Sequence, residues 1–182
     1  MLEITATLVT LIAAITAAVI VLAWCFRRRS RPDGKADNLK TLVREARQGL
    51  EPWDELPADR RAAIAEKCGV AEIQAAIAWL DELARKRDAL PDWDGDSNDD
   101  IAKAQEMLQS ILARVQDRYV EFVTNGLNSP HWWTRVHVAA ALAGHDRAVA
   151  LPILRDALAR ETDETARQLI AMALANAENA KR

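Results

Sequence analysis

The pattern of hydrophobic positions begins with a long apolar run. Residues 4–26 contain no charged side chain, and four of the next five residues, 27–31, are arginine. A bilayer core about 30 Å thick needs roughly 20 apolar residues in a helix that rises about 1.5 Å per residue. The run of 23 residues is therefore long enough to cross it. The pattern predicts an N-terminal transmembrane helix, with residues 1–31 as an anchor that includes an arginine-rich cytoplasmic flank.

The flanks of this run argue against a cleaved signal peptide. Glu3 is the only charged residue before it, so the positive start of a signal peptide is missing, and Trp24-Cys25-Phe26 offers no small-residue cleavage site. Positive residues mark the cytoplasmic side of a membrane helix. We therefore expect a single-pass protein of the cell (inner) membrane with residues 27–182 in the cytoplasm. The alternative is a domain on the outer side.

Small side chains recur every four residues within the apolar run, at Ala6, Thr10, Ala14 and Ala18. Such a transmembrane packing stripe lets a second membrane helix approach closely. It predicts either a homo-oligomer or docking on a larger membrane protein. A segment rich in alanine and threonine also contains such spacings by chance, so both interpretations stay open.

Beyond this run, apolar residues recur at helical spacing and no segment alternates as a strand does. The expected elements are a helix that stops at Gly49, a short helix at 58–67, a helix that ends before Pro91, an acidic loop at 92–100 and a long apolar stripe from Ile101 to Gly126. The predicted fold class is therefore all-α, with one transmembrane helix followed by a soluble α-helical domain.

The C-terminal third repeats itself after 32 residues. Arg135-Val-His-Val-Ala-Ala-Ala-Leu-Ala matches Arg167-Gln-Leu-Ile-Ala-Met-Ala-Leu-Ala at five of nine positions. A period of about 30–40 residues indicates stacked helical hairpins. Between Val123 and Ala177 the chain resembles the HEAT-repeat family, in its short bacterial form with an arginine early in the first helix of each unit.

The resemblance implies that the soluble domain ends in HEAT-like hairpins. It also implies that Arg135 and Arg167 are structural residues that pair with acidic residues of an adjacent turn. The expected domains are an anchor at 1–31, a linker at 32–37, a helical region at 38–126 and a HEAT-like repeat region at 127–182. Whether the helical region consists of diverged repeats is left open by the sequence.

Turn and cap residues fit this interpretation. We expect Ser129 to cap a helix that has Pro130 in its first position, and Asp163 or Thr162 to cap the last helix. Pro152 is expected near the first turn of its helix, where a missing N–H costs less.

The charge balance argues against a nucleic-acid partner. The chain has a net charge of −3, and residues 32–182 contain 20 basic and 26 acidic side chains. They show no basic stripe with interleaved aromatic residues, which a nucleic-acid surface would need. The arginines at 27–31 fit a topology signal in contact with anionic lipid instead.

No motif for catalysis, a cofactor or a metal is recognisable. Counted from the first residue of the acidic segment 92–100, Gly95 falls at position 4, whereas a calcium-binding EF-hand loop needs glycine at position 6. His131, His137 and His145 lack the i, i+4 spacing of a zinc pair on a helix. We therefore expect a protein that is not an enzyme and holds neither cofactor nor metal.

Trp132 and Trp133 are the foremost candidates for partner contact. Neighbouring residues of a helix point about 100° apart, so both rings rarely fit one core, and exposed tryptophan is enriched in binding hot spots. We name Trp132, Trp133, Arg135 and His131 as candidate partner-binding residues. The alternative is that one ring fills the hairpin core and the other lies under the preceding loop.

The predicted function is that of a membrane-anchored cytoplasmic scaffold that binds proteins, as an adaptor, an assembly factor or an accessory subunit of a membrane complex. A self-associating structural membrane protein that depends on the transmembrane packing stripe is the first alternative. The second rests on family resemblance alone, since some short HEAT proteins resemble the lyases that attach chromophores to light-harvesting proteins. The reactive residues of such an enzyme are not recognisable here.

Overall fold

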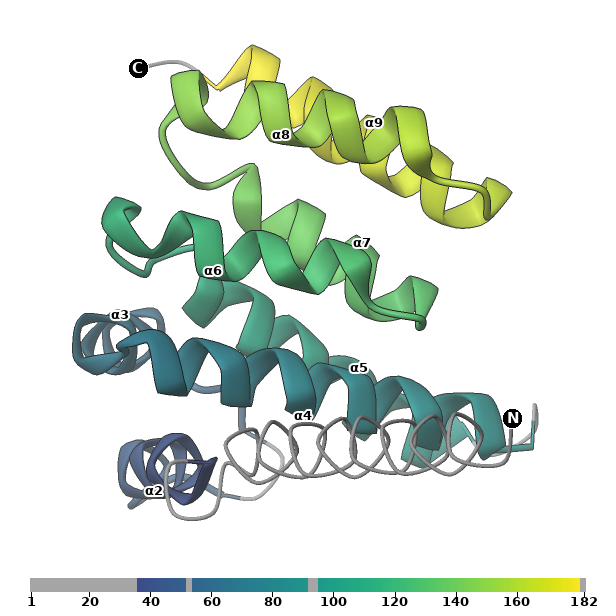
Figure 1. Ribbon diagram of the computed structural model, residues 1–182. Coiled ribbons are helices and arrows are strands. Elements are labelled where there is room, and N and C mark those ends of the chain that lie inside the picture. The colour runs from purple at the N-terminus through teal and green to yellow at the C-terminus, as the bar shows by residue number, and fades with distance from the viewer. Residues whose placement is uncertain (1–35, 52–53, 92–94, 181–182) are drawn as a thin grey trace, which may run out of the picture. The chain divides into compact units, whose positions relative to one another are not determined.

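The computed structural model describes residues 36–51, 54–91 and 95–180. Contacts between residues group Lys35–Arg182 into one compact unit. Within the described residues the chain is helical and contains no strand, which confirms the all-α prediction for this part of the chain (Figure 1).

The predicted anchor at 1–31 and its packing stripe (Ala6, Thr10, Ala14 and Ala18) lie outside the described residues. The transmembrane helix therefore stays a prediction. Among the helices that the structure describes, none combines the length and the apolar character that a membrane span needs.

The helices and short 3-10 turns follow one another through Lys35–Arg182. Their bounds are α2 (Ala36–Ala46), α3 (Ala58–Lys67), α4 (Val70–Ala89), α5 (Gly95–Leu112), η1 (Asp117–Tyr119), α6 (Val120–Thr124), η2 (Asn125–Asn128), α7 (Trp132–Leu142), α8 (Arg147–Arg160) and α9 (Glu164–Asn179). The short helix expected at 58–67 is confirmed as α3, and the helix expected before Pro91 is confirmed as α4.

The core lies along α5 and α7. Helix α5 contacts α3, α4 and α7, and helix α7 also contacts α4, α6 and α9. Leu108, Ile111 and Leu112 of α5 and Val138 and Leu142 of α7 are fully buried. Each such side chain stabilises the fold by about 1.5–3 kcal/mol relative to its exposed state. At the C-terminal end α8 and α9 pack side by side (Figure 1).

The sequence predicts an acidic loop at 92–100, but this segment is helical from Gly95 onward. Helix α5 begins at Gly95, so Asp96, Asp99 and Asp100 are helical. Carboxylates in the first turns of a helix are favoured by the positive end of its dipole, which explains why an acidic segment starts a helix. Ser97 lies within the helix and does not cap it.

The long apolar stripe is interrupted. Helix α5 ends at Leu112, and η1, α6 and η2 replace the rest of the expected helix. His145, from the turn between α7 and α8, donates from Nε2 to the carbonyl oxygen of Leu112 over 2.9 Å. The turn also packs tightly here, because a Cβ on Gly144 would lie 3.1 Å from the Cβ of Ala113. A distant turn therefore fixes the end of α5.

The capping predictions are correct for one helix and wrong for another. Asp163 caps α9, since its Oδ1 accepts from the backbone N–H of Ala166 over 2.9 Å. Helix α7 begins at Trp132 instead of Pro130. The hydroxyl of Ser129 accepts from the N–H of His131 over 3.0 Å. It thus shapes the turn ahead of the helix without capping it.

Pro152 lies further into its helix than we had expected. It is the sixth residue of α8, which begins at Arg147. Its missing N–H would have donated to the carbonyl of Ala148, one turn earlier, so the proline removes a helix hydrogen bond. Pro152 would lie in the first turn only if α8 began several residues later.

Candidate partner-binding surface

Arg135 joins two successive turns of the chain. Its guanidinium forms a bidentate ion pair with Glu161, at 2.7 Å from Nε to Oε2 and 2.8 Å from Nη2 to Oε1. Its Nη1 also donates to the carbonyl oxygens of Ser129 and Pro130, at 3.0 and 3.3 Å. The hydrogen bond from Arg135 lowers the pKa of Glu161 although burial acts in the opposite direction. The pair that the family resemblance implies for Arg135 is therefore present.

Arg167 occupies the equivalent position one period later but is bound differently. It donates to Glu164, three residues earlier on its own helix, over 2.6 Å. The two side chains are 53% and 64% exposed. No adjacent turn among the described residues supplies an acidic partner comparable to Glu161. The expected structural pairing across turns is thus observed for Arg135 and not for Arg167.

The two tryptophans stack on one another instead of diverging by 100°. Their ring centroids lie 3.9 Å apart with 27° between the planes. Arg87, near the end of α4, lies over the ring of Trp133, with Cζ 3.8 Å from its centroid. Both rings are half-buried. The cation and the stacked rings attract one another, so Arg87, Trp133 and Trp132 form a stack of three layers.

His131 adds a second contact between α4 and the start of α7. Its Nδ1 lies 3.8 Å from Oδ2 of Asp88, a carboxylate whose side chain is 52% exposed. Three of the four residues named from the sequence therefore lie together, whereas the guanidinium of Arg135 binds Glu161 and the turn carbonyls. We call the set His131, Trp132, Trp133, Arg87 and Asp88 the tryptophan surface.

A polar layer lies next to this surface. Gln105 is fully buried, and its Oε1 accepts from Nη1 of Arg87 over 3.2 Å. His137 is hydrogen-bonded through Nδ1 to Oε1 of Gln109 over 2.8 Å. Burial, and to a smaller extent the charge of Arg87, lowers the pKa of His137 to about 4. The imidazole is therefore neutral near pH 7.

His145 is also committed to the fold. Besides its bond to Leu112, its Nδ1 lies 3.2 Å from Oδ1 of Asp117, and its side chain is only 2% exposed. The described residues contain no cluster of three or more histidine, cysteine, aspartate or glutamate side chains that could hold a metal ion. His131, His137 and His145 thus contact three different regions of the unit.

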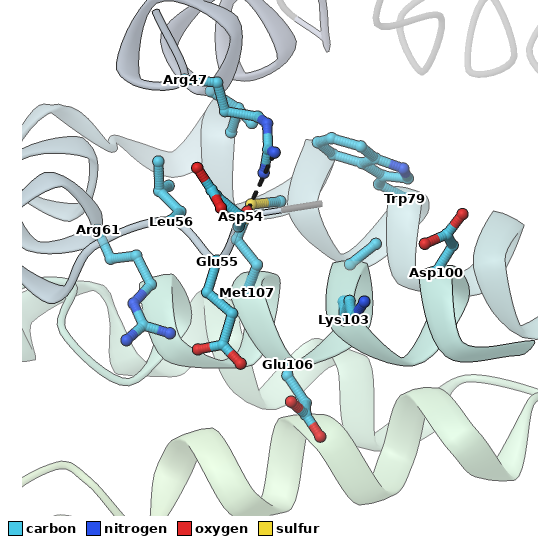
Figure 2. A pocket seen from close by; sticks show the side chains of 12 residues that line it. Arg47, Asp54, Glu55, Leu56, Arg61, Trp79, Asp100, Lys103, Glu106 and Met107 are labelled. Atoms are coloured by element: carbon cyan, nitrogen blue, oxygen red, sulfur yellow. Dashed lines mark hydrogen bonds between the residues drawn. The ribbon is translucent and has the colours of Figure 1, made fainter. Parts of the chain in front are cut away.

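A pocket of about 300 Å³ opens elsewhere, between the 54–61 segment and helices α2, α4 and α5. Figure 2 shows Trp79 on one wall and charged side chains of both signs around the rest. The described residues that line it include no serine, threonine, cysteine or histidine. They therefore offer no hydroxyl, thiol or imidazole for nucleophilic or histidine-based chemistry. Its lining residues are Val43, Arg47, Asp54, Glu55, Leu56, Arg61, Trp79, Asp100, Lys103, Ala104, Glu106 and Met107.

A second hollow, of about 460 Å³, lies between α6 and α8. Its two walls carry residues that are one 32-residue period apart. The equivalent lining residues are Asp117 and Val149, Glu121 and Ile153, Thr124 and Asp156, and Asn128 and Arg160.

The sequence alone does not identify the residues of α4 and α5 that contribute to the tryptophan surface and the polar layer beside it. Arg87 and Asp88 are ordinary charged residues at the end of a helix, and Gln105 is a polar residue in an apolar stripe. Of these three residues, only Gln105 could be recognised from its local sequence, because a glutamine on the buried face of a helix needs a hydrogen-bond partner. The partners of Arg87 follow from the packing of α4 on α5 and α7.

Comparison with known families supports the repeat. A family model described as HEAT repeats matches residues 96–175, from the first turn of α5 into α9. HEAT repeats are helical repeats that commonly mediate protein–protein interaction and generally form non-enzymatic scaffolds. No curated protein and no solved structure matches the chain. The match begins upstream of the resemblance at Val123, so the part of the chain similar to HEAT repeats extends from α5 to α9.

Proposed function

We propose that the protein is a membrane-anchored scaffold that binds a partner protein at the cytoplasmic face of the cell membrane. The apolar run at 4–26 is the anchor, and the helical unit Lys35–Arg182 is the binding part. Stacked hairpins present extended surfaces, and an anchor raises the local concentration of such a surface near other membrane proteins. The role is that of an adaptor, an assembly factor or an accessory subunit of a membrane complex.

The observation that carries this proposal is the tryptophan surface. Two half-exposed tryptophan rings are held by Arg87 in one stack, so little side-chain freedom is lost when a partner covers them. Tryptophan and arginine are enriched among residues that dominate binding energy. Beneath it, the buried Gln105 accepts from Arg87 and the half-buried Gln109 is hydrogen-bonded to His137, so both ends of the surface are tied to α5.

The test is affinity capture of the full chain from membranes in mild detergent, followed by mass spectrometry. We expect Trp132→Ala with Trp133→Ala to lose the partners that the unchanged chain recovers. Trp79→Ala is the matched control, because this tryptophan lines the separate pocket of Figure 2. Far-UV circular dichroism must show that each variant is folded. Recovery of the same partners by the folded double variant would refute the role of this surface.

The anchor is tested separately. The full chain should stay in the membrane pellet after alkaline carbonate extraction, and a chain without residues 1–31 should not. Protease added to intact cells should leave the helical unit uncut, since positive residues at 27–31 predict a cytoplasmic location. Digestion from outside would place the helical unit on the opposite side of the membrane.

A further inference from the structure

The outer face of α9 exposes an unusual residue. Met172 is 61% exposed, and the only other exposed large hydrophobic side chain among the described residues is Val149. Ala171 and Ala175 lie beside Met172 on the same side of the helix, together with Arg167 and Gln168. We call these five residues the α9 outer face.

The internal repeat shows what covers such a face. One period earlier, the positions of Gln168, Ala171, Met172 and Ala175 are occupied on α7 by Val136, Ala139, Ala140 and Ala143. Helix α7 contacts α9, and these four residues, of which Ala143 is the C-cap of α7, are buried or half-buried. On α9, three of the four equivalent residues are exposed and Ala171 is half-buried. The α9 outer face therefore has the position of a packing face without the neighbour that α7 has.

The contacts of Arg135 indicate which charged group a neighbour of the α9 outer face would supply. Next to the covered face of α7, Arg135 receives a bidentate carboxylate from Glu161, in the turn that precedes the covering helix. Oε1 of Glu161 also accepts the backbone N–H groups of Thr162 and Asp163, both at 2.9 Å. An acidic residue at this place thus binds the arginine of one unit and orders the turn of the next.

Arg167 is ready for the same contact. Its present partner, Glu164, is an exposed neighbour on the same helix, and such pairs contribute little to stability. A carboxylate that arrives with a covering helix would be shielded from water and could bind in the bidentate geometry of Glu161. An incoming carboxylate would compete with Glu164 for Arg167.

We propose that the α9 outer face docks an α-helical hairpin of a partner protein, with a carboxylate in the hairpin turn bound to Arg167 and a helix packed over Met172. The site is distinct from the tryptophan surface, and its occupant is defined by the contact that Glu161 and α9 make with α7. It does not depend on the membrane anchor, so it can fail while the proposed function holds.

The first experiment supplies such a hairpin within the chain. In a lengthened full chain, residues 144–182 follow Ala175, which adds one period in register and places a second copy of Glu161 opposite Arg167. We expect Arg167→Gln to raise the unfolding constant about tenfold in the lengthened chain and less than about twofold in the natural chain. When the second copy of Glu161 is also replaced by glutamine, Arg167→Gln should no longer raise the unfolding constant. Arg147→Gln in the first copy of α8 is the matched control.

The second experiment measures how accessible Met172 is to an oxidant. Met172 should be oxidised readily by hydrogen peroxide in the natural chain. In the lengthened chain the first copy of Met172, followed by peptide mass spectrometry with the second copy replaced by leucine, should be oxidised at least about fivefold more slowly. Equal oxidation rates, or additive effects of the two substitutions, would show that a hairpin does not pack on this face. Efficient disulfide-linked dimers of a Met172→Cys variant of the natural full chain would show that a second copy occupies the face and would also overturn the proposal.

Discussion

The neutral, buried imidazole of His137 makes a quantitative prediction about acid stability. The pKa of this group is about 4 in the folded unit, against 6.5 for an ordinary histidine, because burial and the charge of Arg87 disfavour the imidazolium. Between these two values the unfolded chain binds a proton that the folded chain does not. Stability from His137 is therefore complete above about pH 6.5 and is lost as the pH falls toward 4.

The size of the effect follows from the shift. A difference of one pKa unit corresponds to about 1.4 kcal/mol, so a shift from 6.5 to about 4 corresponds to about 3 kcal/mol. We expect the unfolding free energy of the full chain in mild detergent to fall by this amount between pH 7 and pH 4 in addition to other losses. His137→Gln keeps a side chain that can bond Gln109 but removes the titration.

Urea unfolding followed by far-UV circular dichroism at several pH values measures the difference. The unchanged chain and the His137→Gln variant should differ in their slope between pH 6.5 and 4 and run parallel above pH 7. His131→Gln, at the surface near the start of the same helix, is the control for removal of an imidazole. Parallel curves for the unchanged chain and His137→Gln over the whole range would refute the reasoning.

Three further predictions concern stability and reactivity. Gly126→Ala should lower the unfolding free energy by about 1–3 kcal/mol, because a Cβ there would lie 2.5 Å from Cγ2 of Val138; an unchanged urea midpoint would contradict this. Pro152→Ala restores an N–H that can donate to the carbonyl of Ala148 and should raise the melting temperature by several degrees, as calorimetry can check. Burial raises the pKa of the Cys68 thiol to about 12, so in a chain whose other cysteine is replaced by serine, a thiol reagent at pH 8 should react only after urea is added; rapid labelling of the native chain would contradict its burial.

Periodicity was a good guide to helices whose ends are set locally. The helix at 58–67 and the cap at Asp163 follow from residues within one or two turns. The interruption after Leu112 could not be found in this way, because His145 fixes it from 33 residues away. The apolar stripe continues through the break, since the short pieces η1, α6 and η2 still place Val120 and Val123 in the core.

The candidate site was predictable only in part. Two adjacent tryptophans mark a surface in any helical protein, and a periodic arginine indicates a repeated contact, so Trp132, Trp133 and Arg135 could be named from the sequence. Their partners could not, since Arg87 comes from another helix and is 46 residues away from Trp133. The 32-residue period predicts the same role for Arg135 and Arg167, but the role also requires a carboxylate from the next turn.

The contacts of Arg135 set the spacing between neighbouring units of the stack. One planar group holds the turn at Ser129 and Pro130 on one side and the carboxylate of Glu161 on the other. The distance between the two turns is thereby fixed by the length of a single side chain. A protein that spans both turns would meet groups that are already held at a set distance and would lose little conformational entropy in binding them.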